Sequence, residues 1–245
     1  MNIAIIFAGG TGQRMNSRSK PKQFLELHQK PILVYTLEQF QYHPEIDGII
    51  LVTLADWIDY CEQLKTKYQL TKLVAIVSGG ASATESAYNG LSKAAELYSE
   101  DSIVLIHDGV RPLVAKDTIT KDIACVKEHG TAITVSPAIE TITLFSDNSK
   151  NTENKEVNQV VERSKCLMAR APQCFYLKDV LSAYKKSRAN GNRTFIDSAT
   201  MMMHYGYKLY TVEGRPENIK ITTPNDFYMF RAIMDARENT QIFGV

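Results

Sequence analysis

The sequence of 245 residues predicts an α/β fold in which a mainly parallel sheet carries helices on both faces. Two observations predict this class. Short apolar runs alternate along the chain with segments of helical periodicity, and the first run, Ile3–Phe7, leads into the glycine-rich segment Gly9-Gly10-Thr11-Gly12. Parallel sheets of this kind bind ligands beyond the carboxyl ends of their strands, so we expect the functional residues to follow the strands.

The predicted elements follow one another regularly in the first half of the chain. Short apolar runs are typical of buried parallel strands, and longer segments with apolar residues on one side are typical of helices packed against a sheet. The expected strands cover residues 3–7, 48–53, 72–77 and 103–106, and the expected helices cover 32–42, 57–68 and 86–97. The length permits one large α/β domain or two small ones.

One segment departs from this alternation and predicts a protruding β-arm at about 136–165. Ala132–Val135, Glu140–Phe145 and Val157–Val161 resemble strands, whereas Ser146–Glu156 is too polar to pack. A hairpin of this kind has little reason to stand alone in water, so it is a candidate for embracing a second subunit and presenting Thr141 or Arg163 to the neighbour's site. The alternative is a surface flap without a partner.

The composition indicates an ordinary globular protein that binds a small metabolite. Hydrophobic residues make up 44% of the chain and charged residues 22%, and the formal net charge is +1. This charge argues against a broad nucleic-acid surface, so we expect no nucleic-acid partner. The four cysteines are scattered, which favours free thiols in a reducing cytoplasm, and no apolar run is long enough to predict a signal peptide or a membrane span.

The glycine-rich segment predicts a phosphate-binding loop. Glycines let backbone N–H groups approach an anion closely, and the cations Arg14, Lys20 and Lys22 would repel one another unless an anion with several negative oxygens lay between them. A nucleoside triphosphate is such an anion. The spacing matches neither the P-loop nor the dinucleotide fingerprint. The alternative is a strand-to-helix turn whose basic residues are merely solvated.

Three further segments carry candidate site residues. Asp108 follows an apolar strand, where a carboxylate can hold Mg²⁺ or another divalent cation, and Arg111 nearby favours an anion site; the adjacent His107 is either a general base or, as we favour, a hydrogen-bonded structural residue. The segment from Gly79 to Ser86 predicts a loop that enters a helix, with Ser82 or Thr84 as the cap.

Near the end of the chain, Lys220 is predicted on a short strand. Thr223 or Asn225 is then expected to cap a final helix, with Pro224 in its first turn if Thr223 is the cap.

Taken together and in order, these motifs resemble the cytidylyltransferases that make CDP-methylerythritol or CDP-ribitol. The resemblance extends over nearly the whole chain and rests on AGG-x-G-x-RM, PKQF, GG-x5-S, HD-x-VRP, E-x-ITL, ER…APQ-x-F and G-x-x-ENIKITTP-x-D. It implies a single Rossmann-like nucleotidyltransferase domain over residues 1–245, a homodimer formed through the β-arm, and transfer of CMP from CTP to an alditol phosphate with release of pyrophosphate.

The resemblance also assigns roles to residues of this chain. It makes Arg14 and Lys22 stabilisers of the transition state and places Arg163 and Lys220 on the acceptor phosphate or the reacting phosphates. Asp108 matches the Mg²⁺ aspartate with Arg111 close by, and Thr141 and Arg163 match arm positions that reach the partner's acceptor. The implied CTP site comprises Phe7, Ala8, Gly9, Gly10, Gly80, Ala81 and Ser86.

Departures from the family pattern favour one acceptor. Methylerythritol-phosphate enzymes carry a T-D-E-A run where this chain has Ile196 and Ser198 in place of threonine and glutamate, and aspartate where it has Ala81. The chain resembles more closely the ribitol-5-phosphate enzymes of teichoic-acid and capsule synthesis. The alternatives are methylerythritol 4-phosphate of isoprenoid synthesis as acceptor, a sugar-phosphate nucleotidyltransferase using UTP or GTP, and a nucleotide-binding protein without catalysis.

Overall fold

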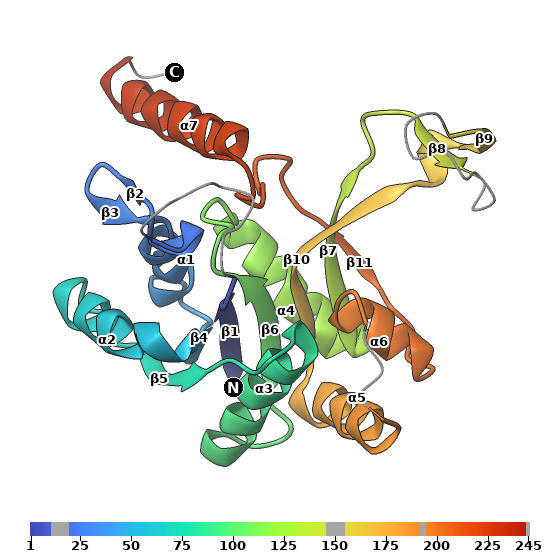
Figure 1. The fold of residues 1–245 in the computed structure, drawn as a ribbon, viewed down its shortest axis with the longest axis horizontal. Helices are drawn as coiled ribbons and strands as arrows, with labels where there is room; N and C mark the ends of the chain where they lie inside the picture. Colours follow the sequence, from blue (N-terminus) through green and yellow to red (C-terminus); the bar gives the residue numbers. More distant parts are fainter. Residues whose placement is uncertain (11–19, 146–154, 192–194, 244–245) are drawn as a thin grey trace.

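A seven-stranded sheet forms the centre of the protein, in the computed structural model, which describes residues 1–10, 20–145, 155–191 and 195–243 (Figure 1). The strand order is β11-β7-β10-β6-β1-β4-β5, and only β10 runs antiparallel to its neighbours. The strands are β1 (Asn2–Ala8), β4 (Gly48–Thr53), β5 (Leu73–Ser78), β6 (Ile103–Asp108), β7 (Thr131–Pro137), β10 (Leu167–Tyr176) and β11 (Thr211–Glu213). The predicted α/β class with a mainly parallel sheet is confirmed.

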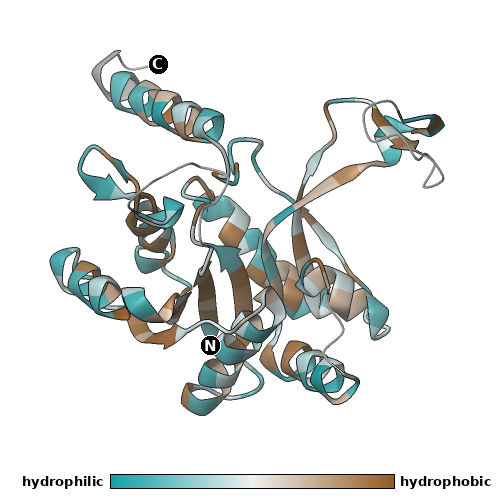
Figure 2. Cartoon of the chain, in the orientation of Figure 1, coloured by the Kyte–Doolittle hydropathy of each residue, from teal (hydrophilic) through white to brown (hydrophobic). Residues whose placement is uncertain are grey.

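Helices cover both faces of this sheet, because β1 carries apolar side chains on both of its faces. Ala4 and Ile6 of β1 pack in one buried cluster and Ile3 and Ile5 in the other, because successive side chains of a strand point to opposite faces. The first cluster includes residues of α1 (Ile32–Gln41), α2 (Ile58–Lys67) and α4 (Lys116–His129); the second includes α3 (Ala83–Leu97), α5 (Leu177–Ala189) and α6 (Ser198–His204). Figure 2 shows the hydrophobic colouring concentrated in the central strands.

The C-terminal helix and several short elements pack around a smaller apolar cluster. A third apolar cluster joins Leu27, Ile32, Leu113, Ile221 and Phe230, and so packs the C-terminal helix against the first third of the chain. The remaining elements are the short strands β2 (Glu26–Leu27) and β3 (Lys30–Pro31), the 3₁₀ helices η2 (Lys22–Phe24), η3 (Ala55–Trp57) and η4 (Arg163–Lys165), and α7 (Pro224–Phe243). None of the helices in the described part of the chain combines the length and apolar character needed to cross a bilayer.

The predicted strand at Lys220 is wrong. Residues 214–223 form an irregular loop, because their backbone hydrogen bonds go to isolated partners: Ile221 N donates to Val110 O at 2.9 Å and Ile219 N to Glu217 O at 2.7 Å. The prediction for the helix that follows is confirmed. Helix α7 begins at Pro224, and the Oγ1 atom of Thr223 accepts from the N–H of Asp226 at 3.4 Å.

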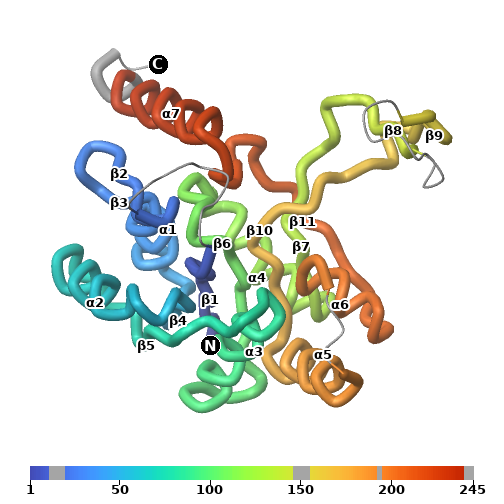
Figure 3. The backbone as a smooth tube through the Cα atoms, viewed as in Figure 1, coloured from blue at the N-terminus to red at the C-terminus, as the bar shows by residue number. Residues whose placement is uncertain are grey.

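The arm is present as a separate two-stranded sheet. Strands β8 (Ile142–Phe145) and β9 (Val157–Val161) pair antiparallel, and Figures 1 and 3 show them projecting from the body at the ends of β7 and β10. Residues 146–154 of the predicted polar turn lie outside the described residues. Large apolar side chains of this region are exposed, among them Ile139 at 77% and Val160 at 62%.

A buried carboxyl lies in the core between α4 and β7. The Oδ2 atom of Asp122 accepts a hydrogen bond from Thr134 Oγ1 at 2.8 Å, and Oδ1 has no partner among the described residues. Burial raises the pKa of Asp122 to about 8, although the hydrogen bond from Thr134 opposes that shift. The side chain is therefore mainly protonated at neutral pH.

This carboxyl makes folding stability depend on pH. The unfolded pKa of Asp122 is near 4, so between about pH 4 and pH 8 the folded chain holds a proton that the unfolded chain has lost. We expect the free energy of unfolding in urea to fall on the order of 2 kcal/mol between pH 5.5 and pH 7.5 from this group. Asp122→Asn, which keeps a neutral side chain, should remove most of that fall. Asp59→Asn on the exposed side of α2 is the control, and an equal slope in Asp122→Asn and the unsubstituted chain would contradict the assignment.

Candidate active site

A cavity of about 570 Å³ opens at the carboxyl ends of β1 and β6, next to the start of α3. Its walls come from segments far apart in the chain, including the end of β1, the loop and helix start between Gly80 and Ala87, β10 and residues 195–198. Of the predicted site residues, it is lined by Phe7, Ala8, Gly9, Gly10, Lys22, Gly80, Ala81, Ser86, Asp108, Arg111 and Lys220. The expectation that the motifs meet at the carboxyl edge of the sheet is confirmed.

The end of β1 and helix η2 form one side of the cavity. Gln23 Nε2 donates to Ala8 O at 2.6 Å, which fixes η2 against the end of the strand. A Cβ atom built on Gly10 would lie 3.7 Å from Lys22 Cε, so the Lys22 side chain passes close to the glycine backbone. Arg14 and the rest of the glycine-rich loop lie outside the described residues, and their predicted role stays a prediction.

The 79–86 loop is fixed by its own side chains. Ser82 caps α3 by accepting from Glu85 N at 3.1 Å, as predicted. Ser86 Oγ accepts from Gly80 N at 3.0 Å, and Glu85 Oε2 accepts from Ala81 N at 2.9 Å. These hydrogen bonds hold Gly80 and Ala81 at the cavity wall, at the electropositive N-terminal end of α3.

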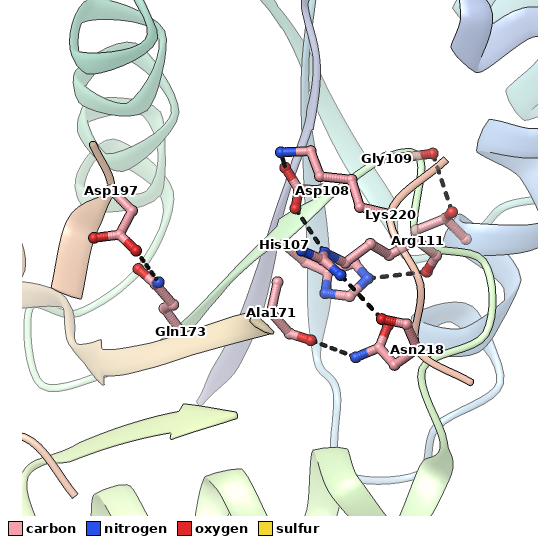
Figure 4. A network of polar contacts seen from close by, with 10 residues as sticks. His107, Asp108, Gly109, Arg111, Ala171, Gln173, Asp197, Asn218 and Lys220 are labelled. Atoms are coloured by element: carbon pink, nitrogen blue, oxygen red, sulfur yellow. Dashed lines mark hydrogen bonds and ion pairs between the residues drawn. The ribbon is translucent and has the colours of Figure 1, made fainter. Parts of the chain in front are cut away.

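Asp108 at the end of β6 binds two cations. Lys220 Nζ lies 2.8 Å from Oδ1, and Arg111 Nε lies 2.8 Å from Oδ2 (Figure 4). Burial disfavours the charged form of Asp108, but the charges and hydrogen bonds of Lys220 and Arg111 outweigh it and lower the pKa to about 2. The carboxylate is therefore ionised at neutral pH, and its side chain is 27% exposed.

A chain of hydrogen bonds extends from Arg111 across the back of the cavity. Arg111 Nη1 donates to Asn218 O at 2.9 Å, and Asn218 Nδ2 donates to Ala171 O at 2.6 Å (Figure 4). His107 Nε2 donates to Arg111 O at 3.1 Å, and burial lowers the pKa of His107 to about 4. This neutral, buried ring supports the structural interpretation of His107 over a general base.

The cavity also contains polar residues that the sequence patterns do not identify as site residues. Gln173 Nε2 donates to Asp197 Oδ2 at 2.8 Å (Figure 4). Its Oε1 accepts from Ala199 N at 2.9 Å. Asp197 also caps α6. Gln173 and Asn218 stand inside two of the quoted motifs, which is the signal that could have identified them. Ile196 lies at the cavity with 92% of its surface exposed.

Two predicted residues do not reach this cavity within one chain. Thr141 and Arg163 belong to the arm and do not line it. Arg163 Nη1 donates instead to Ile139 O at 3.1 Å, within the arm. These residues could contribute to a site only if the arm of another copy approached it.

Asp108 fits the chemistry of a magnesium ligand. An ionised carboxylate has about four lone-pair sites, so two ion pairs leave acceptor capacity facing the cavity. Mg²⁺ commonly takes one or two carboxylates and completes its octahedron with substrate phosphates and water. The only described group of three such ligands, His28, Asp235 and Glu238, is solvent-accessible and lies outside the cavity.

The arrangement suits the binding of a polyphosphate. Lysine and arginine side chains converge on an open cavity beside the start of a helix, and such groups stabilise negative charge on phosphate oxygens. The one histidine in the cavity wall is buried and neutral, so nothing among the described residues there resembles a nucleophile activated by a base. The site is therefore built to bind and neutralise anions.

Comparisons with known proteins agree with this geometry. The sequence profile of the family described as "IspD: 2-C-methyl-D-erythritol 4-phosphate cytidylyltransferase" matches residues 2–236. A ribitol-5-phosphate cytidylyltransferase of Streptococcus agalactiae serotype III is 49% identical over the full length of both chains. A 2-C-methyl-D-erythritol 4-phosphate cytidylyltransferase of Clostridium botulinum strain Langeland is 37% identical, covering 96% of this chain and 97% of the relative.

Comparison with solved structures leads to the same family. The crystal structure of 4-diphosphocytidyl-2C-methyl-D-erythritol synthase from Anaerococcus prevotii superimposes with a TM-score of 0.79 at 27% identity, covering 96% of each chain. The resemblance in the sequence motifs is thereby confirmed, and with it the assignment to the nucleotidyltransferase enzymes. The chain belongs to the IspD family of cytidylyltransferases.

Proposed function

We propose that this protein transfers CMP from CTP to D-ribitol 5-phosphate, yielding CDP-ribitol and pyrophosphate. The observation that carries the proposal is the 49% identity over the whole chain to a ribitol-5-phosphate cytidylyltransferase, against 37% to a methylerythritol-phosphate enzyme. Ala81, Ile196 and Ser198 support it, because they depart from the methylerythritol-phosphate pattern and all line the cavity. CDP-ribitol would then supply teichoic-acid or capsule synthesis.

The proposed reaction needs positive charge more than it needs a base. A phosphate monoester with a second pKa near 6 is already mostly dianionic at neutral pH, so its oxygen can attack the α-phosphorus of CTP without losing a proton. A new P–O bond forms as the bond between the α-phosphorus and the bridging oxygen breaks, and pyrophosphate leaves with the electron pair. The obstacle is repulsion between two anions.

Each cation has a proposed place in this reaction. Lys22, beside the glycine backbone, and Arg14 would neutralise the triphosphate and the charge that develops as pyrophosphate leaves. Lys220, whose ammonium lies beside Asp108, and Arg163 from the arm would hold the acceptor phosphate in line for attack. Gly9, Gly10, Gly80, Ala81 and Ser86 would contact CTP along the wall between β1 and α3.

Asp108 is the proposed ligand of Mg²⁺, which when bound supplies further neutralisation of phosphate charge. The carboxylate keeps its charge because Lys220 and Arg111 stabilise the ionised form. Arg111 and Asn218 hold its position at the end of β6 through their hydrogen bonds.

We also propose that the arm joins two copies of the chain into a homodimer. Its exposed apolar side chains, among them Ile139, Phe145, Val157 and Val160, would be costly in water unless another surface covered them. An arm exchanged between two copies would bring the partner's Thr141 and the partner's Arg163 toward the cavity, which they do not reach within one chain.

The first prediction from the proposed function concerns the acceptor. We expect Mg²⁺-dependent pyrophosphate release from CTP with D-ribitol 5-phosphate, and at least tenfold lower kcat/KM with 2-C-methyl-D-erythritol 4-phosphate, since a mismatched polar acceptor leaves groups of the site unpaired. UTP and GTP serve as nucleotide controls. Preference for methylerythritol phosphate would move the protein to isoprenoid synthesis. CTP binding without release of pyrophosphate from CTP in the presence of either acceptor would favour the non-catalytic alternative.

The second prediction concerns Lys220. Lys220→Ala should lower kcat/KM for the acceptor about a hundredfold, because it removes a cation that contacts the reacting phosphate. Lys185→Ala on the exposed side of α5 is the matched control and should leave kinetics unchanged. A loss smaller than threefold in Lys220→Ala, with the fold intact by circular dichroism, would contradict the proposed role.

The third prediction concerns the arm. Arg14→Ala and Arg163→Ala chains should each be nearly inactive, but mixing and re-equilibrating them should restore about a quarter of the unsubstituted activity, because mixed dimers contain one intact site. The mass of the chain at micromolar concentration, measured by light scattering, should be that of a dimer. A monomeric mass or an absence of recovery on mixing would argue against arm exchange.

A further inference from the structure

Arg170 brings an additional cation into the cavity. It lies on β10, lines the cavity together with Asp108, Arg111 and Lys220, and does not belong to the residues assigned above. Among the described residues it makes no ion pair with a carboxylate; its hydrogen bond joins Nε to Ser136 Oγ at 3.0 Å. Unlike Arg111, it is therefore a cavity arginine whose charge is not balanced by a neighbouring carboxylate.

The backbone of β10 sets the position of Arg170. Strand β10 pairs with β7 from Leu167 to Ala169 and again from Gln173, but the register shifts between Ala169 and Gln173. Its pairing with β6 begins only at Gln173, which lies opposite Ile106. Because β10 runs antiparallel, the irregular stretch lies past the carboxyl end of β6, at the edge where Asp108 emerges.

The polar network described above holds this irregular stretch in place. Asn218 Nδ2 donates to the carbonyl of Ala171, the residue directly after Arg170, and Asn218 O accepts from Arg111. The loop that carries Lys220 is thus tied to the backbone next to Arg170. The hydrogen bonds that position Arg111 and the Lys220 loop beside Asp108 therefore also position Arg170.

The charges around the cavity do not cancel. Among the described lining residues, Lys22, Arg111, Arg170 and Lys220 are cationic, whereas Asp108 and Asp197 are anionic. Burial lowers the pKa of the Arg170 guanidinium, and the Arg111 cation lowers it further, so the two arginines repel each other. A dianion bound between them would remove that repulsion.

The hydrogen-bonding groups of Arg170 match a phosphate. With Nε engaged by Ser136, the two terminal NH₂ groups form a planar fork with no partner among the described residues. A guanidinium fork binds two phosphate oxygens in parallel, which an ammonium group cannot do. The side chain is thus fixed at one end and able to bind an anion at the other.

We propose that Arg170 binds the phosphate group of the acceptor, holding its non-attacking oxygens, and so is a positioning and specificity residue for alditol phosphates. This inference rests on the proposed function. The location of Arg170 favours the acceptor over the triphosphate, because Arg170 lies beside Arg111 and the Lys220 loop, whereas Lys22 and the two glycine segments form the nucleotide side. Arg170 lies within the register shift of β10, and the irregular backbone there allows its side chain to line the cavity.

Direct binding of inorganic phosphate tests the proposal independently of turnover. The full chain is first saturated with a CTP analogue that carries a methylene group between the α- and β-phosphorus atoms, so that the triphosphate site is filled. Calorimetric titration with phosphate should then give a Kd about tenfold or more higher for Arg170→Ala, as expected for loss of a charged hydrogen-bonding partner. Arg170→Lys, which keeps the charge without the fork, should fall between the two.

Two controls separate this effect from misfolding. Arg231→Ala removes an exposed arginine of α7 that pairs with Asp235, and should leave phosphate binding within twofold. Ser136→Ala leaves the guanidinium in place but removes its orienting partner, so it should weaken phosphate binding less than Arg170→Ala does. An Arg170→Ala chain with unchanged thermal stability and unchanged phosphate affinity would overturn the proposal, as would an absence of phosphate binding by the unsubstituted chain up to tens of millimolar.

Steady-state kinetics then distinguish the acceptor from the nucleotide. With ribitol 5-phosphate, Arg170→Ala should raise the acceptor KM about tenfold or more and change the CTP KM less than threefold. A rise confined to the CTP KM would assign Arg170 to the triphosphate and overturn the proposal. If the unsubstituted chain releases no pyrophosphate with ribitol 5-phosphate, the proposed function fails, while the phosphate titration still decides the role of Arg170.

Discussion

The site depends on one carboxylate shared by two cations. Asp108 holds Lys220 and Arg111 at 2.8 Å each, and these three side chains come from the end of β6, the turn after it and a loop more than a hundred residues later in the chain. Without the carboxylate, the two cations would repel each other in a partly buried place. Because Arg111 also binds the backbone of Asn218, and Asn218 binds the backbone of Ala171, the shared charge fixes the relative positions of three separate segments.

The antiparallel direction of β10 complements this arrangement. The parallel strands deliver their carboxyl ends to the cavity edge, whereas β10 delivers residues that precede its pairing with β6. One strand thereby contributes Arg170 and Gln173 to the cavity and continues outward into the arm. The cation-rich wall near Lys220 and the polar pair of Gln173 and Asp197 are both consequences of this single reversal.

The regular part of the fold was predictable because periodicity reports burial. The apolar runs of β1, β4 and β6 are buried in a sheet covered on both faces, and the segments after β1, β5 and β6 carry glycines and charges of the site. Lys220 was misplaced because alternating Asn-Ile-Lys-Ile resembles a strand. The neighbouring N–H groups instead bond to single carbonyls, that of Ile219 to Glu217 within the loop and that of Ile221 to Val110. Arg170 and Asp197 could not be identified as cavity residues from the sequence. A charged residue in a strand or before a short helix is common, and only the folded chain shows which residues surround it.

The continuity of β10 limits how the protein can be re-engineered. Removing the arm at about 136–165 as a module, by joining β7 directly to β10, would remove Ser136 and Pro137, the partners of Met168 and Leu167 in the ladder that anchors the register shift from its outer side. On that side the Ala169–Val135 pair would be the only part of the described ladder to remain, and Arg170 would lose its hydrogen bond to Ser136. A grafted or shortened arm must therefore retain the ladder up to Pro137 and Leu167, and the acceptor wall and the arm have to be transplanted as one unit.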